Sequence, residues 1–236
     1  MLKIINLTKT YGKTVKAVDG LNITVNAGEI YGFIGHNGAG KSTTIKSIVG
    51  ALDFEEGDII IDGNSIVKNP LKAKEVMAYV PDNPDVYDYL TGIQYLNFVC
   101  DVFGVSAEER DEKISKYADV FQLKDNLGDI ISSYSHGMRQ KLVLISALCH
   151  NPKLLILDEP FVGLDPIASY RLKEIMRELC DNGGAIFFST HVLEVAEKLC
   201  DRVGIIKEGK LVKEGTMQEI AGDKSLESLF LEIADE

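Results

Sequence analysis

The sequence contains a glycine-rich segment of a type that binds phosphate. Residues 35–42 read GHNGAGKS and fit the pattern G-x-x-x-x-G-K-[ST] without deviation. Glycines at this spacing let successive backbone N–H groups turn towards an anion, and a following helix N-terminus adds partial positive charge. In this pattern Lys41 reaches the β- and γ-phosphates of a nucleotide, and the Ser42 hydroxyl binds Mg²⁺. We therefore predict a phosphate site formed by His36, Asn37, Gly38, Ala39, Gly40, Lys41, Ser42 and Thr43.

Two adjacent carboxylates follow an apolar run further along the chain. Leu154–Leu157 reads as a buried strand, and Asp158 and Glu159 come directly after it. Open α/β sheets bind ligands at the carboxyl ends of their strands. We expect Asp158 to hold Mg²⁺ through water and Glu159 to orient or deprotonate an attacking water, a role worth about 10²–10⁴-fold in rate. On their own these residues would equally fit a strand that ends in solvated acids.

Alternating strands and helices are predicted to position these residues. Period-2 alternation predicts a strand over Leu21–Val25, and an apolar run predicts a buried strand over Ile30–Ile34. Further strands are predicted at 58–61, 154–157, 185–189, 203–206 and 211–213. Helices are predicted after Gly40 and over 90–103, 106–121, 137–150 and 166–182. The fold class is α/β: a parallel-sheet core with an N-terminal antiparallel β part and a helical insertion.

The length of the chain limits the number of domains. At 236 residues, it is long enough for one large domain or two small lobes. We expect a single domain over residues 1–236, in which 1–81 and 151–236 form the nucleotide-binding core and 82–150 a helical subdomain.

The charge of the chain excludes some partners. Lys and Arg number 25 and Asp and Glu number 36, so the net charge is −11. This argues against a nucleic-acid partner and against direct electrostatic binding to an anionic membrane. The charge is uneven, because residues 1–50 hold six Lys and two acids, a net +4, which leaves −15 for the rest.

The cysteines and the apolar segments indicate a compartment. Cys100, Cys149, Cys180 and Cys200 show no C-x-x-C spacing, so we expect buried, reduced thiols in a reducing cytosol. The N-terminus has no apolar signal region, and no apolar run approaches the roughly 20 residues that span a bilayer. We expect a soluble chain.

Three further motifs narrow the family. Tyr134–Gln140 reads YSHGMRQ, Gly163–Asp165 reads GLD shortly after the paired acids, and Ser189–His191 reads STH at the end of the next strand. The Lys-x-Asp segment with which GTPases read guanine does not occur. In this order and spacing, over essentially the whole chain, the sequence resembles the ATP-binding cassette (ABC) family of transporter ATPase subunits.

The resemblance implies a fold and a division of roles. The fold would be that of a RecA-like P-loop NTPase, with two chains packed head-to-tail around two ATP molecules. Ser135 and Gly137 would contact the ATP bound to the partner subunit, and Asp165 would lie at the interface between the chains. His191 would contact the γ-phosphate and order Glu159 and water, and Tyr11 would stack on adenine. The catalytic residues implied are Glu159, His191 and Lys41.

The sequence departs from the family pattern at two places. Asp82 stands where the family usually has Gln, and a shorter, ionised side chain can only accept hydrogen bonds. We expect it to join Ser42 and Asp158 as a ligand of Mg²⁺. His136 and Met138 replace the commonest Gly and Gln of the signature, as in some export-type members. We assign no catalytic role to His36 or His136.

The function implied is that of an ATPase whose hydrolysis moves a substrate through separate membrane subunits. These permease subunits would dock near residues 82–105, where Tyr87, Tyr89 and Leu90 supply anchors. The chain looks most similar to a bacterial ABC-2-type exporter subunit, peripheral on the inner face of the cell membrane. Two alternatives stay open at this point: a non-transport ABC protein that acts as an ATP-switched interaction module, and a P-loop kinase or other transferase.

Overall fold

A six-stranded sheet forms the centre of the protein. The computed structural model describes residues 1–12, 14–222 and 224–235. The strands follow the order β10-β9-β3-β8-β7-β6, all parallel except β10, which pairs antiparallel with β9. Their bounds are β3 (Ile30–Ile34), β6 (Met77–Val80), β7 (Leu154–Asp158), β8 (Ala185–Thr190), β9 (Arg202–Lys207) and β10 (Lys210–Thr216). Every residue of β3, β7 and β8 is buried, as expected for strands that are covered on both faces.

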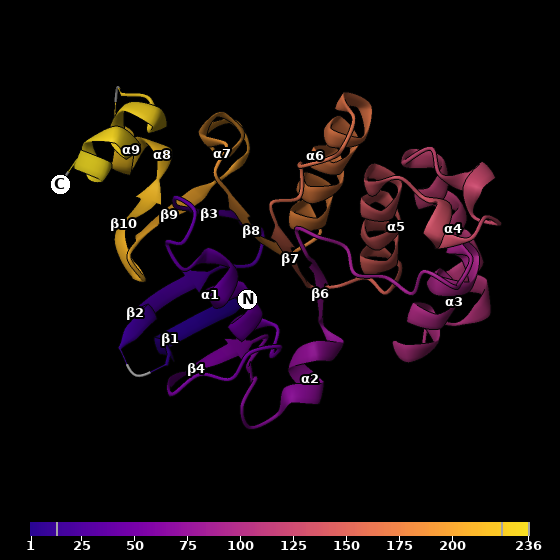
Figure 1. Ribbon diagram of the computed structural model, residues 1–236, viewed down its shortest axis with the longest axis horizontal. Coiled ribbons are helices and arrows are strands. Elements are labelled where there is room, and N and C mark those ends of the chain that lie inside the picture. Colours follow the sequence, from indigo (N-terminus) through magenta and orange to yellow (C-terminus); the bar gives the residue numbers. More distant parts are fainter. Residues whose placement is uncertain (13, 223, 236) are drawn as a thin grey trace.

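A four-stranded antiparallel sheet lies beside the first sheet (Figure 1). Its order is β2-β1-β4-β5, with β1 (Leu2–Tyr11), β2 (Val15–Val25), β4 (Glu56–Ile61) and β5 (Asn64–Ser65). The helix α1 (Lys41–Ile48) contacts both β2 and β7. One hydrophobic cluster joins the two sheets, because Leu21 and Ile23 of β2 pack with Phe33 of β3 and Phe187 of β8.

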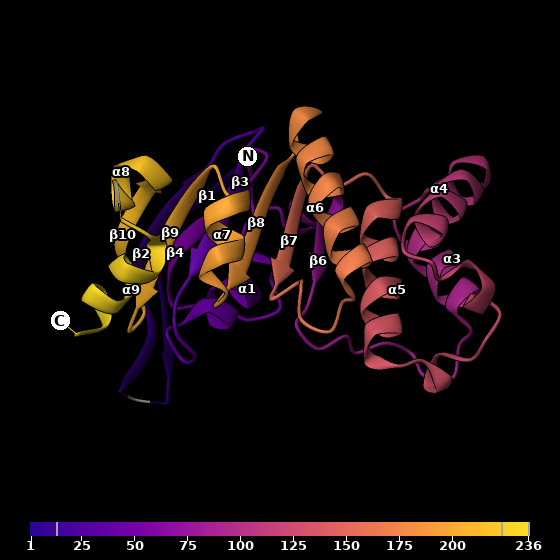
Figure 2. The same ribbon diagram turned by 90° about the horizontal axis from the view of Figure 1, so that it is seen from above.

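The remaining helices lie at the two ends of the central sheet and, for α6 and α7, over its middle strands (Figures 1 and 2). Beyond β6 lie α3 (Gly92–Val102), α4 (Ala107–Val120) and α5 (His136–Cys149), and α6 (Pro166–Asp181) stands between them and α7 (Leu193–Leu199). At the β10 end lie α8 (Met217–Ala221) and α9 (Leu226–Asp235), and the short α2 (Pro70–Glu75) precedes β6. We propose that residues 82–150 form a helical subdomain and that 1–81 and 151–236 form the nucleotide-binding core.

The predicted fold class is confirmed, and the prediction missed several short or irregular elements. The strand β1 was not predicted because bulges between Ile4, Leu7 and Lys9 break the alternation of buried and exposed residues. The helices α2 and α7 have six and seven residues, too few for an amphipathic period to show.

The four cysteines lie in the interior of the protein or close to it. Cys100, Cys149 and Cys180 are buried, Cys200 is partly buried, and all four are free thiols. Burial raises the pKa of Cys149 to about 12, so this thiol stays protonated.

Among the residues described above, no helix combines the length and the apolarity that crossing a bilayer requires.

Candidate functional site

Four neighbouring strands end at one edge of the central sheet and bring distant motifs together. The glycine-rich loop follows β3, His191 follows β8, Glu159 follows β7, and Asp82 follows β6 after one residue. These strands are consecutive in the sheet, in the order β3-β8-β7-β6. Because they are parallel, their carboxyl ends meet at the edge where α/β sheets bind ligands.

The loop after β3 has a shape that only glycine allows at two positions. A Cβ atom on Gly40 would lie 2.4 Å from the Ala17 carbonyl oxygen, and the φ of Gly40 is +112°, a left-handed value. A Cβ atom on Gly35 would lie 2.7 Å from the Ile206 carbonyl oxygen. No side chain caps the start of α1, so its first N–H groups are available to an anion. The loop therefore fits the phosphates of a nucleotide.

A lysine, a glutamate and a histidine from three strand ends form one chain of contacts. The Lys41 ammonium donates to the Gly35 carbonyl at 2.7 Å, and its Nζ lies 3.7 Å from Oε1 of Glu159. The other carboxylate oxygen of Glu159 lies 2.9 Å from Nδ1 of His191 and accepts the His191 backbone N–H. The Glu159 carboxylate is therefore held between a phosphate-binding lysine and the histidine that follows β8.

A second carboxylate lies deeper in the same edge. Asp158 is 4% exposed and accepts hydrogen bonds from the Ser189 and Ser42 hydroxyls. Burial raises the pKa of the Asp158 carboxyl, and the two hydrogen bonds oppose that shift. The oxygen atoms of Ser42 and Asp158 are hard donors of the kind that Mg²⁺ prefers.

The described residues do not form a metal site by themselves. They contain no group of three or more His, Cys, Asp or Glu side chains that could bind a metal ion. Mg²⁺ is commonly bound by one or two carboxylates together with substrate phosphates and water. Ser42 and Asp158 beside a phosphate loop fit that mode of binding.

The other predicted site residues lie around this centre. Asp82 is exposed, and its charge contributes to the raised pKa of Asp158. Tyr11 ends β1, half-exposed, with Nζ of Lys9 at 5.8 Å from its ring centroid. Nδ1 of His36 lies 2.7 Å from its neighbour's carbonyl oxygen. Of the remaining loop residues, Asn37, Gly38 and Ser42 are exposed, Thr43 is partly buried and Ala39 is buried.

The signature residues lie apart from the chain's own phosphate loop. Ser135 caps α5, accepting the Met138 N–H at 3.3 Å, and a Cβ atom on Gly137 would lie 2.8 Å from the Gly163 carbonyl oxygen. Figures 1 and 2 show α5 on the far side of β6 and β7 from α1. The structure thus brings Lys41, Glu159 and His191 together. The signature residues lie away from them, at the start of α5.

Sequence reasoning missed two contacts among the motif residues. Asp165 caps α6, and it also forms an ion pair with Lys141 of α5 at 2.6 Å. Ser189 was noted only as part of a motif, although its hydroxyl contacts Asp158. Both contacts join residues far apart in the chain, so no local pattern could have revealed them.

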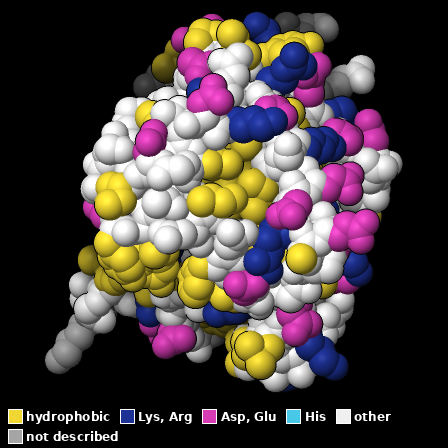
Figure 3. Space-filling view, turned by 90° about the vertical axis from the view of Figure 1, so that its right-hand side faces the viewer, with side chains coloured by type: hydrophobic (Ala, Val, Ile, Leu, Met, Phe, Trp, Pro, Cys, Tyr) yellow, Lys and Arg dark blue, Asp and Glu magenta, His cyan; other side chains and the backbone are white. Residues whose placement is uncertain are grey.

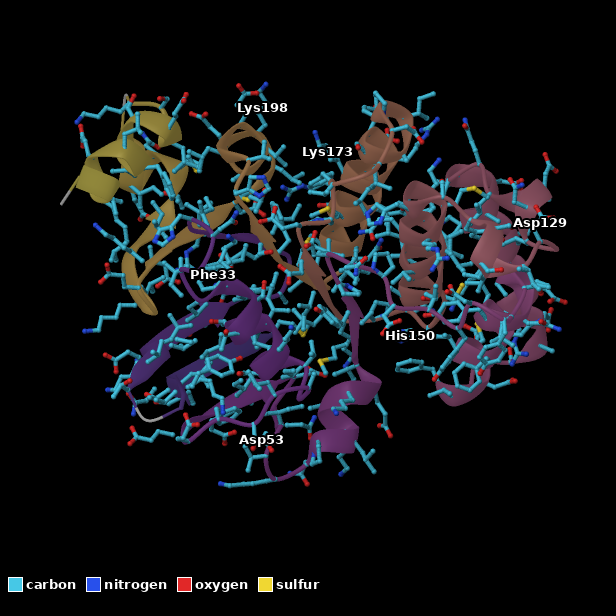
Figure 4. The ribbon with its side chains drawn as sticks, viewed as in Figure 1. Phe33, Asp53, Asp129, His150, Lys173 and Lys198 are labelled. Atoms are coloured by element: carbon cyan, nitrogen blue, oxygen red, sulfur yellow. The ribbon has the colours of Figure 1, made fainter. Side chains whose placement is uncertain are left out.

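A groove separates the central sheet from the helices beyond β6. It has a volume of about 400 Å³, and its lining includes Tyr79, Tyr95, Phe103, His150 and Lys74. Figure 4 shows His150 at the end of α5, and its ring stacks on Phe103 at 3.7 Å between centroids. A larger cavity of about 640 Å³ is lined by other residues, among them Met1 and Lys153, and by none of the nucleotide-site residues.

An aromatic cluster lies next to this groove. The Tyr87 ring packs against the rings of Tyr89, Tyr95 and Phe98 at 5.7–6.4 Å between centroids. Figure 3 shows hydrophobic side chains gathered in patches on this side of the molecule, where α3 and α4 lie.

Comparisons with known proteins agree with the geometry. A family model described as "ABC transporter" matches residues 18–162. YhcH of Bacillus subtilis, an uncharacterized ABC transporter ATP-binding protein, is 40% identical over 215 residues, which are 90% of this chain and 68% of YhcH. LptB, the lipopolysaccharide export system ATP-binding protein of Escherichia coli, is 34% identical over 232 residues, 96% of this chain and 95% of LptB. A solved structure of an ATP-binding subunit of an ABC transporter matches with a TM-score of 0.95 at 33% identity and covers 99% of both chains.

Proposed function

This chain belongs to the ABC transporter family as an ATP-binding subunit with ATPase activity, and on that premise we propose how it uses ATP. It binds MgATP in a head-to-tail dimer and couples hydrolysis to substrate translocation by separate membrane subunits. The observation that supports this most is the contact of Glu159 with both Lys41 and His191 at the sheet edge. That contact supports the assignment of Glu159 as a base beside the proposed position of the phosphates.

The residues at the sheet edge divide the chemistry among them. The loop N–H groups and Lys41 bind the phosphates, and Tyr11 stacks on the adenine. Glu159 orients or deprotonates the attacking water, and His191 holds the Glu159 carboxylate and contacts the γ-phosphate. Ser42, Asp158 and Asp82 would hold Mg²⁺, which would neutralise negative charge on the phosphates. The products are ADP and phosphate.

A second chain completes each site. Ser135 and Gly137 belong to the start of α5, and α5 lies beyond β7 from α1, the helix that follows the phosphate loop (Figure 1). In a head-to-tail pair, the start of α5 would face the ATP held by the partner, and its N–H groups would bind the γ-phosphate. The partner is a second copy or a close paralogue.

The substitution Glu159→Gln tests the catalytic assignment. Loss of the base should leave ATP binding intact and nearly abolish turnover, so ATP-bound dimer should accumulate in size-exclusion chromatography with light scattering. Glu174→Gln is the matched control, because Glu174 is exposed and pairs with Arg171 on α6. Retained hydrolysis in Glu159→Gln would remove Glu159 from this role.

We propose that the membrane subunits bind near residues 82–105, at the aromatic cluster and the part of the groove that these residues line. Tyr89 is 74% exposed there, and Tyr87 and Leu90 lie beside it in sequence. LptB serves an export system, and we propose export of the ABC-2 type for this chain as well. The chain would then lie on the inner face of the cell membrane, bound to its permease.

Affinity purification from membranes discriminates this proposal from a non-transport role. A multi-span membrane protein should co-purify with the tagged chain. Recovery of ribosomes or DNA without any such protein would favour the ATP-switched interaction module, which the net charge of −11 disfavours.

A further inference from the structure

The last residues of β8 lie against the paired acids at the end of β7. The parallel register pairs Asp158 with Ser189, so these two residues are neighbours across the sheet. Ser189 is fully buried, and Asp158 is 4% exposed. A buried carboxylate is stable only where hydrogen bonds replace its water. Ser189 is one of the two side chains that supply them.

One hydroxyl contacts both members of the acid pair. The Ser189 Oγ–H donates to Oδ1 of Asp158 at 2.5 Å. The same oxygen accepts the backbone N–H of Glu159 at 3.1 Å. The Glu159 N–H also lies 3.3 Å from the Ser189 carbonyl oxygen. Because the hydroxyl proton is used on Asp158, its lone pair is free for Glu159, and the two bonds reinforce one another.

The backbone of Glu159 needs this support. Its φ is +49°, in the left-handed region that a side chain other than glycine adopts at a cost. This conformation turns the Glu159 carboxylate towards Lys41 and His191 instead of continuing the strand. The N–H bond to Ser189 is made at the residue where the chain turns.

We infer that Ser189 is a positioning residue that fixes the Asp158 carboxylate for the cation and the Glu159 backbone for the attacking water. The inference rests on the proposed function, which assigns Mg²⁺ to Asp158 and the base role to Glu159. Ser189 is fully buried and contacts both acids, so it acts through them. Asp158 is held from two sides, by Ser42 of the phosphate loop and by Ser189 of the next strand.

The role predicts an effect that depends on the cation. Without Ser189, the Asp158 oxygen loses one of its two hydrogen-bond donors and rotates more freely. Binding of ATP with Mg²⁺ should weaken, while binding of ATP alone depends on Lys41 and the loop and should not change. Loss of a hydrogen bond to a charged group changes an equilibrium constant by roughly 10- to 100-fold.

The experiment compares Ser189→Ala with Ser189→Thr, which restores a hydroxyl on a strand where Thr is favoured. A fluorescent ATP analogue is titrated into each full chain with Mg²⁺ and, separately, with EDTA. For Ser189→Ala we expect about 10-fold weaker binding with Mg²⁺, unchanged binding with EDTA, and turnover reduced at least 10-fold. Ser189→Thr should recover most of the Mg²⁺-dependent binding.

Ser146→Ala is the matched control, because Ser146 is buried and its hydroxyl donates to the Val143 carbonyl within α5, away from the two acids. It should leave both titrations unchanged, and thermal unfolding should show all three variants folded. Equal weakening of Ser189→Ala with Mg²⁺ and EDTA would mean a merely structural role and overturn the inference, as would wild-type behaviour in both. Failure of the wild type to bind and hydrolyse ATP would instead overturn the proposed function.

Discussion

At the scale of single residues, the site depends on side chains that are held before ATP arrives. The Lys41 ammonium is buried. It donates a hydrogen bond to the Gly35 carbonyl and forms an ion pair with the Glu159 carboxylate. When phosphate binds, it replaces partners that already neutralise this charge, so little desolvation remains to be overcome. His191 is exposed beside Glu159 and is free to turn towards a phosphate.

One residue outside the site makes stability depend on pH. Burial, assisted by the charge of Lys113, lowers the pKa of His150 from 6.5 to about 4. The unfolded chain binds this proton below pH 6.5, and the folded chain binds it only below about pH 4. Stability is therefore complete above pH 6.5 and is lost as the pH falls towards 4. Between pH 7.5 and 5 we expect a loss of about 2 kcal/mol in the free energy of unfolding from this group.

Urea unfolding of the wild type and of His150→Leu at both pH values measures this contribution. The substitution should remove about 2 kcal/mol of the difference between the two pH values, whatever its effect at pH 7.5. An unchanged difference in His150→Leu would show that other groups cause the acid sensitivity.

At the scale of elements, the local sequence indicated helix caps and the glycine-rich loop, but it did not indicate which residues contact one another across neighbouring strands. The capping box of Thr216 and Glu219 and the Asp165 cap both join residues three positions apart, so the local sequence is enough to indicate them. The glycine-rich loop was predicted for the same reason. The contact of Ser189 with Asp158 depends on the register of β7 and β8, which no local pattern encodes. The strand β1 was missed because its bulges break the period.

The packing of α9 allows a test at this scale. Leu226 is fully buried in a cluster with Ile34, Ala196 and Val203, whereas Leu231 of the same helix is 60% exposed. Leu226→Ala should lower the free energy of unfolding by about 2–4 kcal/mol through the cavity it leaves. Leu231→Ala should change it by less than about 0.5 kcal/mol. Equal effects in denaturant unfolding would contradict the packing described for α9.

At the scale of the whole molecule, the nucleotide and the proposed membrane partner are bound at different places. The proposed ATP site lies at the carboxyl edge of the central sheet, and the groove and aromatic cluster lie next to α3. A chain with a net charge of −11 gains no electrostatic attraction from anionic lipid. Attachment to a membrane would therefore depend on contacts with a protein partner.

Tyr89→Ala tests that attachment. Removal of this exposed ring should weaken binding to the membrane subunits and reduce ATP-driven transport at least several-fold, while the ATPase activity of the isolated chain stays unchanged. Transport by the reconstituted complex and ATPase by the isolated chain are the two measurements. Val212→Ala, an exposed position on β10, is the control. Unchanged transport by Tyr89→Ala would rule out this docking position.

The helix α5 runs from the signature residues to the groove. It begins after Ser135, which would face the partner's ATP, and it ends at His150, which lines the groove. Its 14 residues make a rod of roughly 21 Å. A tilt of about 10° around one end would move the other by about 4 Å, roughly two thirds of a helical turn. If the dimer closes on ATP as proposed, this helix would transmit the movement to a partner bound in the groove.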